Sequence, residues 1–182
     1  GKCRYGLMLN EDGMVYDDGV TTRLDENRYI MTTTTGGAAN VMGKLEDYLQ
    51  TEWPELDVYL TSVTDHFATV SVCGPNSKKI VSNVIHDLDF SDENFPHMSF
   101  KNAKIGKINC RVMRISFTGE LSYEINIQAN YAKSVWEKCM EAGKDYNITP
   151  YGTETMHLLR AEKGFIIVGQ DTDATMTPID LQ

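Results

Sequence analysis

The sequence has 182 residues, of which 41% are hydrophobic, and it carries a formal net charge of −9 at pH 7. A chain of this size can bury the core of one ordinary domain or of two small packed units. Its acidic surface repels phosphate backbones, and no apolar run has the length of a bilayer span. We therefore expect neither a nucleic acid nor a membrane as a partner.

None of the cysteines forms a Cys-x-x-Cys pair or joins a Cys/His cluster of the kind that binds zinc. This pattern predicts buried reduced thiols, a cytoplasmic location and no metal site, for Cys3, Cys73, Cys110 and Cys139. The first residues run directly into patterned sequence and the last ones stop abruptly. We therefore expect a piece of a longer polypeptide.

The N-terminal part of the chain predicts antiparallel hairpins followed by a helix. Short apolar runs rich in Thr, Ile and Tyr alternate with polar turns, which gives strands at residues 5–9, 14–16, 20–24 and 28–33. Gly36 and Gly37 open the helix, and apolar residues recur within it at helical spacing. Pro54 cannot continue the helix, so we expect it to end near Trp53.

The middle of the chain predicts strands at 57–64 and 67–73, a helix starting at Pro75, and a surface loop over 89–99. Further strands are expected at 103–117 and 121–127. Next come a helix capped by Asn130 and stopped by a left-handed Gly143, a helix over 153–163, and a strand at 165–168. The helix after Asn130 should turn Trp136 and Cys139 inward. This order predicts an α+β fold with helices on one face of an antiparallel sheet.

Two adjacent carboxylates, Asp17 and Asp18, occupy a predicted strand. Successive side chains of a strand point to opposite faces, so one can face solvent while the other enters a cleft. A carboxylate in a cleft can steer a nitrogen lone pair or take a proton. The alternative is a solvated Asp-Asp-Gly turn.

A second candidate is Glu120, which follows Phe117 at a predicted turn, with Tyr123 and Glu124 just beyond. A carboxylate can accept two hydrogen bonds from an amidine-like edge such as that of a pterin, and an aromatic ring can form an apolar wall beside it. The alternative is a hairpin turn with an exposed glutamate.

A third candidate is Arg160, which lies two positions before Glu162 on a predicted helix, so the two side chains do not face each other. An inward arginine can bind a ligand carboxylate with two hydrogen bonds. The alternative is a structural ion pair.

Taken in order, these segments resemble one family. Residues 8–18 are similar to the LN-x-x-G-x-x-x-DD strand pair of the glycine-cleavage T-protein, residues 118–125 to its Y-T-G-E…E-I signature, and residues 159–171 to its LR-x-E-x-G…G-x-D segment. The chain thus resembles the aminomethyltransferase family over nearly its whole length. Within this family, the segments MTTTTGG at 31–37 and RAEKGFIIVGQDTD at 160–173 are most similar to the alpha-subunit branch of heterotetrameric sarcosine oxidases.

The resemblance implies a fold with a split antiparallel domain, a ferredoxin-like domain and a C-terminal barrel. Residues 1–50 would form part of the split domain with a helix, and 51–145 the ferredoxin-like domain. Residues 146–182 would form a helix and strand that return to the first domain, before the barrel. Missing strands would leave sheet edges unpaired, so we expect self-association.

The resemblance also implies a reaction. A flavin in another part of such an oxidase converts sarcosine to an imine, and tetrahydrofolate bound to this module captures the carbon as 5,10-methylenetetrahydrofolate, leaving glycine. Flavin and NAD are expected outside this chain, and the other sarcosine oxidase subunits are the expected partners. The alternative is a non-catalytic folate-binding or structural domain of the same superfamily.

Carried onto this sequence, the family pattern makes Asp18 the catalytic carboxylate. It is preferred to Asp17 because related variants with one Asp keep the acid at the second position. Glu120 would read the pterin edge, with Phe117 and Tyr123 beside the ring.

Arg160 would support the same site. The sequence departs from the family pattern at Phe117, which replaces a tyrosine, and at Met156, which replaces an arginine. Both departures change the expected ligand contacts.

Overall fold

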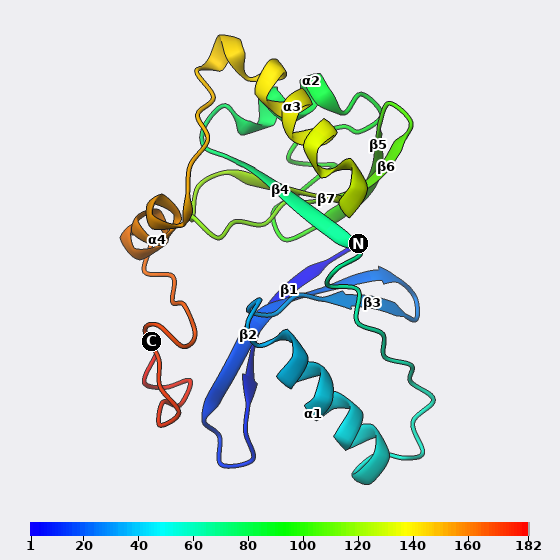
Figure 1. Cartoon of the computed structure of the whole chain (residues 1–182), viewed down its shortest axis with the longest axis vertical. Coiled ribbons are helices and arrows are strands. Elements are labelled where there is room, and N and C mark those ends of the chain that lie inside the picture. The colour runs from blue at the N-terminus through cyan, green and yellow to red at the C-terminus, as the bar shows by residue number, and fades with distance from the viewer. Residues whose placement is uncertain (182) are drawn as a thin grey trace. The chain divides into compact units, whose positions relative to one another are not determined.

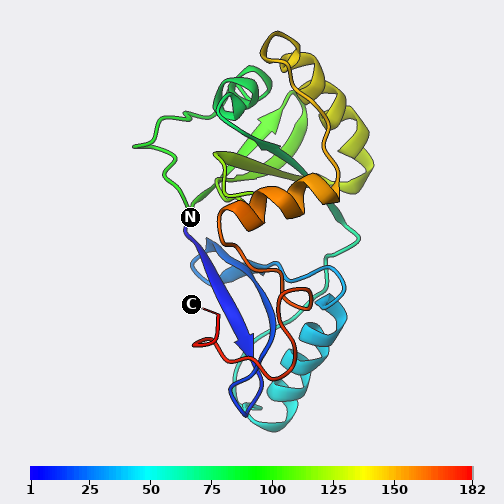
Figure 2. The ribbon, with the colours of Figure 1, turned by 90° about the vertical axis from the view of Figure 1, so that its left-hand side faces the viewer.

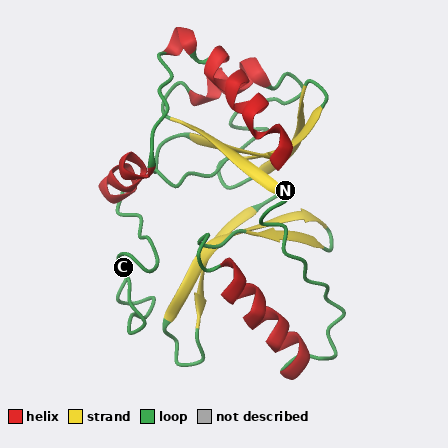
Figure 3. Cartoon of the chain, viewed as in Figure 1, coloured by secondary structure: helices red, strands yellow, loops and turns green. Residues whose placement is uncertain are grey.

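The computed structural model describes residues 1–181 and confirms the predicted α+β class, with antiparallel sheets and four α-helices (Figures 1 and 3). The chain divides into two compact units built from interleaved segments. The first unit contains 1–3, 22–29 and 65–166. The second contains 4–21, 30–64 and the chain from 167 onward.

The first unit contains a four-stranded antiparallel sheet with the order β4-β7-β6-β5. Its strands are β4 (Phe67–Cys73), β5 (Phe100–Ile105), β6 (Ile108–Met113) and β7 (Ser122–Gln128). Helices α2 (Ser77–Val84) and α3 (Ala132–Ala142) lie together over one face of this sheet (Figure 1).

Alternation along the strands separates an apolar face from a polar one. Val70 and Val72 of β4 and Ile125 of β7 point into the core beneath the helices. The residues between them point to the opposite face, where polar side chains bond one another across the strands. Arg111 donates to Asn126 at 3.0 Å, Asn126 donates to Thr69 at 3.2 Å, and Ser71 and Ser122 share a hydrogen bond of 3.3 Å.

The predicted strand at 103–117 is wrong in its extent. It is a hairpin of β5 and β6 that turns at Gly106, whose φ of 62° is readily adopted only by glycine. The loop over 89–99 does exist, but it is not only a surface feature. Phe90 and Phe95 within it are buried in the core, so this loop closes one side of the hydrophobic cluster.

Helix α3 starts and ends differently from the prediction. A 3₁₀ turn, η1 (Ala129–Tyr131), contains Asn130, which is therefore not the cap. Gly143 has a φ of −92°, and its lack of a side chain serves close packing, because a Cβ there would lie 2.5 Å from Cβ of Ile148. The left-handed residue is Asn147, which ends η2 (Lys144–Tyr146). Cys139 is buried as predicted, whereas Trp136 is 44% exposed.

Helix α4 (Thr153–Glu162) confirms the predicted helix, and Gly164 follows it with a φ of 73°. The strand predicted at 165–168 is wrong, since this segment has no strand pairing. The carbonyl of Phe165 instead accepts a hydrogen bond of 3.0 Å from Arg160, which fixes the chain as it leaves α4.

The strands β1 (Cys3–Leu9), β2 (Val15–Asp25) and β3 (Arg28–Met31) pair in that order and contribute residues to both units. The predicted turn between β1 and β2 is confirmed, with Gly13 at a φ of 82°. The strands predicted at 14–16 and 20–24 merge into β2. Position 19 of β2 has no room for a side chain, because a Cβ on Gly19 would lie 1.7 Å from the carbonyl oxygen of Thr32.

Helix α1 (Ala38–Thr51) follows Gly37 and ends just before Trp53-Pro54, as predicted. It lies beside the β1–β2 hairpin in both views (Figures 1 and 2). The strand predicted at 57–64 is wrong, because this stretch pairs with no strand among residues 1–181. β-propensity reflects packing on a paired sheet, and here the side chains of Val58 and Tyr59 are 49% and 91% exposed.

The four cysteines are free, and the predicted burial is confirmed for Cys3, Cys110 and Cys139. Cys73 is only partly buried, contrary to the prediction. Burial raises the pKa of the Cys110 thiol to about 12 and that of Cys139 to about 11, so both stay protonated. Within the described part of the chain, no group of three metal-ligating side chains gathers. The helices described there also lack the length and apolar character required to cross a bilayer.

Candidate functional site

Asp17 and Asp18 have opposite environments on β2. Asp17 is 2% exposed. Its Oδ1 accepts hydrogen bonds from the backbone N–H groups of Asp18 at 2.8 Å and Thr34 at 3.0 Å, and its Oδ2 accepts one from the Thr34 hydroxyl at 3.0 Å. A Cβ on Gly37 would lie 1.8 Å from Oδ2. Asp17 therefore has a structural role, because it holds the loop that leads into α1.

Asp18 lies half-buried and accepts a hydrogen bond of 2.9 Å from the hydroxyl of Tyr5. Burial raises the pKa of Asp18 above its usual value. The charge of Asp17 raises it further, while the Tyr5 hydrogen bond partly lowers it. Of the two carboxylates, Asp18 is the one with accessible surface and a raised pKa. These are the properties of a group that can stabilise a cation or exchange a proton.

Glu120 lies on the turn between β6 and β7, next to Gly119, whose φ is 76°. Its Oε1 lies 3.4 Å from Nζ of Lys163, the residue that ends α4. A Cβ on Gly119 would be 2.1 Å from Cγ of Lys163. The turn and the end of α4 are thus packed against each other, and the partly exposed Glu120 is held by an ion pair.

Glu124 was singled out in the sequence only as a neighbour of Glu120. It lies on the polar face of β7, opposite Ser71 of β4. Its side chain is half-buried, and burial raises the pKa of its carboxyl group to about 7. No hydrogen bond or ion pair of this carboxylate is found among residues 1–181. A partly buried carboxylate with a raised pKa and no such partner is a candidate for binding a ligand.

Tyr123, the neighbour of Glu124 on β7, points the other way. It is fully buried, and its ring packs edge-on against Phe90 and at a tilt against Phe95. Its hydroxyl has no hydrogen-bond partner among the described residues. This position gives Tyr123 a packing role that fixes β7, and with it the direction of Glu124.

Phe117 and Arg160 differ in exposure. Phe117 is 39% exposed, ahead of the Glu120 turn, and presents its ring to solvent. Arg160 is 7% exposed and donates a hydrogen bond to the carbonyl of Phe165. Its guanidinium therefore stabilises the end of α4.

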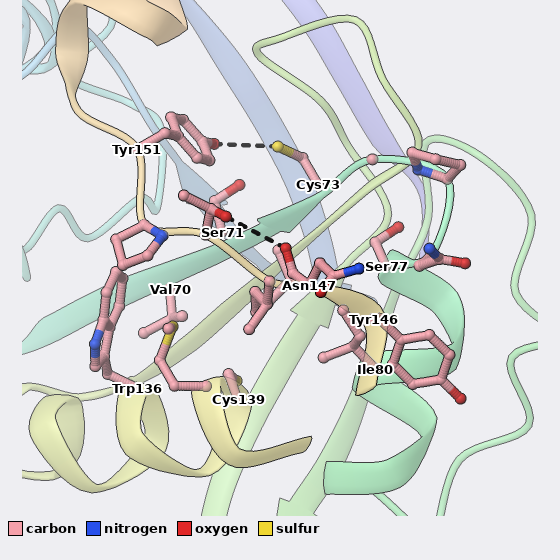
Figure 4. Close-up of a pocket in the computed structure, with 18 residues that line it drawn as sticks. Val70, Ser71, Cys73, Ser77, Ile80, Trp136, Cys139, Tyr146, Asn147 and Tyr151 are labelled. Carbon is pink, nitrogen blue, oxygen red and sulfur yellow. Dashed lines mark hydrogen bonds between the residues drawn. The ribbon is translucent and has the colours of Figure 1, made fainter. Parts of the chain in front are cut away.

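A cavity of about 420 Å³ opens along β4 in the first unit, between the start of α2, helix α3 and residues 146–151 (Figure 4). No charged side chain lines it. At one end the thiol of Cys73 donates a hydrogen bond of 3.4 Å to the hydroxyl of Tyr151, with Ser71 nearby (Figure 4). Burial, and to a smaller extent the hydrogen bond with Cys73, raises the pKa of Tyr151 to about 12. Tyr151 is not among the candidate site residues predicted from the sequence.

The structure brings together, within the first unit, the Glu120 turn, the end of α4 with Arg160, and the β7 strand that carries Tyr123 and Glu124. Asp18 belongs to the second unit, where Tyr5 and Asp17 surround it. The predicted residues thus form two groups. One contains Glu120 and Glu124, and the other contains Asp17 and Asp18.

Comparison with known proteins shows the family to which the chain belongs. The GCVT N-terminal domain family matches residues 1–182. The chain is 59% identical over 99% of its length to a sarcosine oxidase subunit alpha of Corynebacterium sp. (strain P-1), and 47% identical over 100% of its length to that of Rhizobium meliloti (strain 1021). It spans 19% and 18% of those proteins.

More distant relatives include an aminomethyltransferase of Corynebacterium aurimucosum, 26% identical over 99% of this chain and 48% of that protein. The fold matches the crystal structure of glycine cleavage system aminomethyltransferase T from Bartonella henselae, with a TM-score of 0.82 and 24% identity. That match covers 99% of this chain and 45% of the other. The chain belongs to the GCVT N-terminal domain family, whose members similar to it are sarcosine oxidase alpha subunits and aminomethyltransferases.

Proposed function

We propose that this chain is the tetrahydrofolate-binding one-carbon transfer module of a sarcosine oxidase alpha subunit. In this proposal the imine made by sarcosine oxidation reacts with tetrahydrofolate to give 5,10-methylenetetrahydrofolate and glycine. The identity of 59% to a sarcosine oxidase subunit alpha supports the choice of enzyme. Flavin, NAD and the other oxidase subunits would be contributed from outside these residues.

The observation that carries the folate proposal is the state of Glu124. Its side chain is half-buried, burial raises the pKa of its carboxyl group to about 7, and no ion pair of this group is found among residues 1–181. The N3–H and 2-amino groups of a pterin are two adjacent donors, which match the two oxygens of a carboxylate. A bound pterin would thus supply the hydrogen bonds that this buried group lacks.

We extend the pterin role from Glu120, which the sequence favoured, to both carboxylates, with Glu124 as the stronger contact. Glu120 already has Lys163 as a partner at 3.4 Å, so its contribution to binding would be smaller. Phe117 would provide an apolar wall beside the ring. Tyr123 and Arg160 would not contact the pterin directly. Tyr123 would fix the position of β7 by packing in the core, and Arg160 would stabilise the end of α4.

Asp18 is the proposed catalytic carboxylate. As an anion it would stabilise the cationic imine through electrostatic attraction. Tyr5 would hold it in place and keep it ionised, since its hydrogen bond opposes the effect of burial on the pKa. Asp17 would contribute only to the structure of this region.

We also propose that the four-stranded unit corresponds to the ferredoxin-like domain of the family, over about residues 51–145. Residues 1–50 and 146–182 would belong mainly to the split antiparallel domain. The interleaved segments of the two units are consistent with an exchange of chain between domains, although residues 51–64 lie in the second unit and residues 146–166 in the first.

Calorimetric titration of tetrahydrofolate tests the proposal, with Glu124→Gln and Glu120→Gln compared with the unmodified chain. We expect Glu124→Gln to weaken binding by about 1.5–3 kcal/mol, the range for a hydrogen bond to a charged group, and Glu120→Gln to have a smaller effect. Saturable binding that neither substitution changes would contradict the proposed pterin contacts. If neither the chain nor the full-length protein that contains it binds tetrahydrofolate, the folate assignment fails.

A further inference from the structure

Tyr151 lies on the same face of the four-stranded sheet as Glu124. Its hydroxyl is 3.4 Å from Sγ of Cys73 and within hydrogen-bonding reach of Ser71. Ser71 is the residue directly opposite Glu124 in the β4–β7 register. Residues opposite each other in an antiparallel pair have Cβ atoms about 5 Å apart and share a face. The phenol of Tyr151 is therefore located over β4, close to the Glu124 carboxylate, whose charge also acts on it.

The hydrogen bonds of Tyr151 leave its proton available. The thiol of Cys73 donates to the phenol oxygen, as Figure 4 shows for the pair. A phenol has one O–H to donate in addition to the hydrogen bonds it accepts. Since its pKa is raised to about 12, this O–H stays protonated at neutral pH. The sheet face thus presents a neutral donor, Tyr151, beside an acceptor, Glu124.

A pterin has the complementary pattern along one edge. Its 2-amino and N3–H donors are followed directly by the 4-oxo oxygen, which is an acceptor. We propose that Tyr151 donates a hydrogen bond to this 4-oxo oxygen while Glu124 accepts from N3–H and the 2-amino group, an inference that rests on the proposed function. Tyr151 then determines specificity, because it distinguishes a 4-oxo ring from a 4-amino ring.

The distinction follows from the chemistry of the two rings. A 2,4-diaminopteridine has a donor where the pterin has its oxo acceptor. Its 4-amino group cannot accept the hydrogen bond from Tyr151. A site with two opposed donors leaves one of them unpaired, which makes discrimination larger than the value of one hydrogen bond formed.

The test measures the affinity of the full-length protein for tetrahydrofolate and for its 4-amino analogue, in the unmodified form and as Tyr151→Phe. We expect Tyr151→Phe to weaken tetrahydrofolate binding by roughly three- to tenfold, the scale of one neutral hydrogen bond, and to strengthen binding of the analogue or leave it within about twofold, because the opposed donor is gone. Tyr146→Phe is the matched control. It removes another phenol that lines the same cavity, next to Lys79, and should change neither affinity.

The outcomes separate this inference from the proposed function. Equal weakening of both ligands, or no change in either, would overturn the role of Tyr151, because a purely structural residue does not alter the ratio of the two affinities. Glu124→Gln serves as the independent arm. If it leaves tetrahydrofolate binding unchanged, the proposed function itself fails, whatever Tyr151→Phe does.

Discussion

The hydroxyl of Tyr5 on β1 donates a hydrogen bond of 2.9 Å to Oδ2 of Asp18 on β2. This contact opposes burial, which raises the pKa of Asp18. Burial, and then the contact with Asp18, raise the pKa of Tyr5 above its usual value. The pair therefore sets how easily Asp18 loses its proton. A carboxylate that must be an anion to act depends on this balance.

Tyr5→Phe should raise the pKa of Asp18 further, because it removes the hydrogen bond that lowers it. A carbon-detected NMR titration of the Asp18 carboxyl group measures this directly, and the acidic limb of any activity profile should move to higher pH in parallel. Tyr59→Phe, which alters a tyrosine that is 91% exposed, is the control. An unchanged Asp18 titration in Tyr5→Phe would show that the hydrogen bond has no influence.

Asp17→Asn should destabilise the fold more than Asp18→Asn. Both carboxylate oxygens of Asp17 accept hydrogen bonds, from the backbone N–H and the hydroxyl of Thr34. In Asp17→Asn, an NH2 group replaces one of these oxygens and so faces a hydrogen-bond donor. The loss of buried hydrogen bonds to a charged group is worth about 1–3 kcal/mol. Urea unfolding of the two variants at pH 7 gives the comparison. If Asp18→Asn proves as costly as Asp17→Asn, the division into a structural and a functional carboxylate is wrong.

Glu124 should make the protein less stable as pH rises. Its pKa is raised from 4.5 to about 7 in the folded state. Between these values the folded state holds a proton that the unfolded state has lost, so the free energy of unfolding falls with increasing pH and levels off above about 7. The fall is on the order of 1–3 kcal/mol.

Glu124→Gln should remove this fall, so its stability relative to the unmodified chain should improve between pH 5 and pH 8. Denaturant unfolding at both values checks the prediction, with Glu120→Gln as a variant that leaves the buried carboxyl group in place. Identical pH profiles for Glu124→Gln and the unmodified chain would show that Glu124 titrates normally.

The sequence predicts an element correctly where the signals for it lie within that element or at its ends. Helix α1 was predicted from its apolar spacing and from Gly37 and Pro54, and α4 from its spacing and Gly164. The stretch 57–64 has equally strong strand propensity but no partner strand in the described chain. A strand depends on a second segment that its own sequence does not contain. The hairpin at Gly106 was missed because a single glycine was too weak a turn signal in a long apolar run.

The candidate site shows the same limit. The alternation rule predicted that Asp17 and Asp18 point to opposite faces, but only the contacts with Thr34 and Tyr5 show which is enclosed. For Glu124, a usable signal did exist. It lies between the core residues Tyr123 and Ile125, so a period of two places it on the polar face of the sheet.

Self-association should occur through exposed apolar side chains of the segment after α1. Leu56, Val58 and Tyr59 are 49%, 49% and 91% exposed, on a chain segment with strand propensity and no partner in the described structure. Val58→Asp should lower the fraction of dimer in sedimentation velocity, while Val63→Asp, at a less exposed position of the same stretch, should affect it less. A monomer at high concentration in the unmodified chain contradicts the prediction.

The proposed role of Asp18 in one-carbon transfer to tetrahydrofolate is tested by the product distribution of the complete oxidase. Sarcosine turnover with tetrahydrofolate present should be compared between the unmodified enzyme and Asp18→Asn, with formaldehyde and 5,10-methylenetetrahydrofolate both quantified. We expect unchanged sarcosine oxidation in Asp18→Asn, with free formaldehyde in place of the folate product. An unchanged ratio of the two products would contradict it and favour a non-catalytic folate-binding or structural domain.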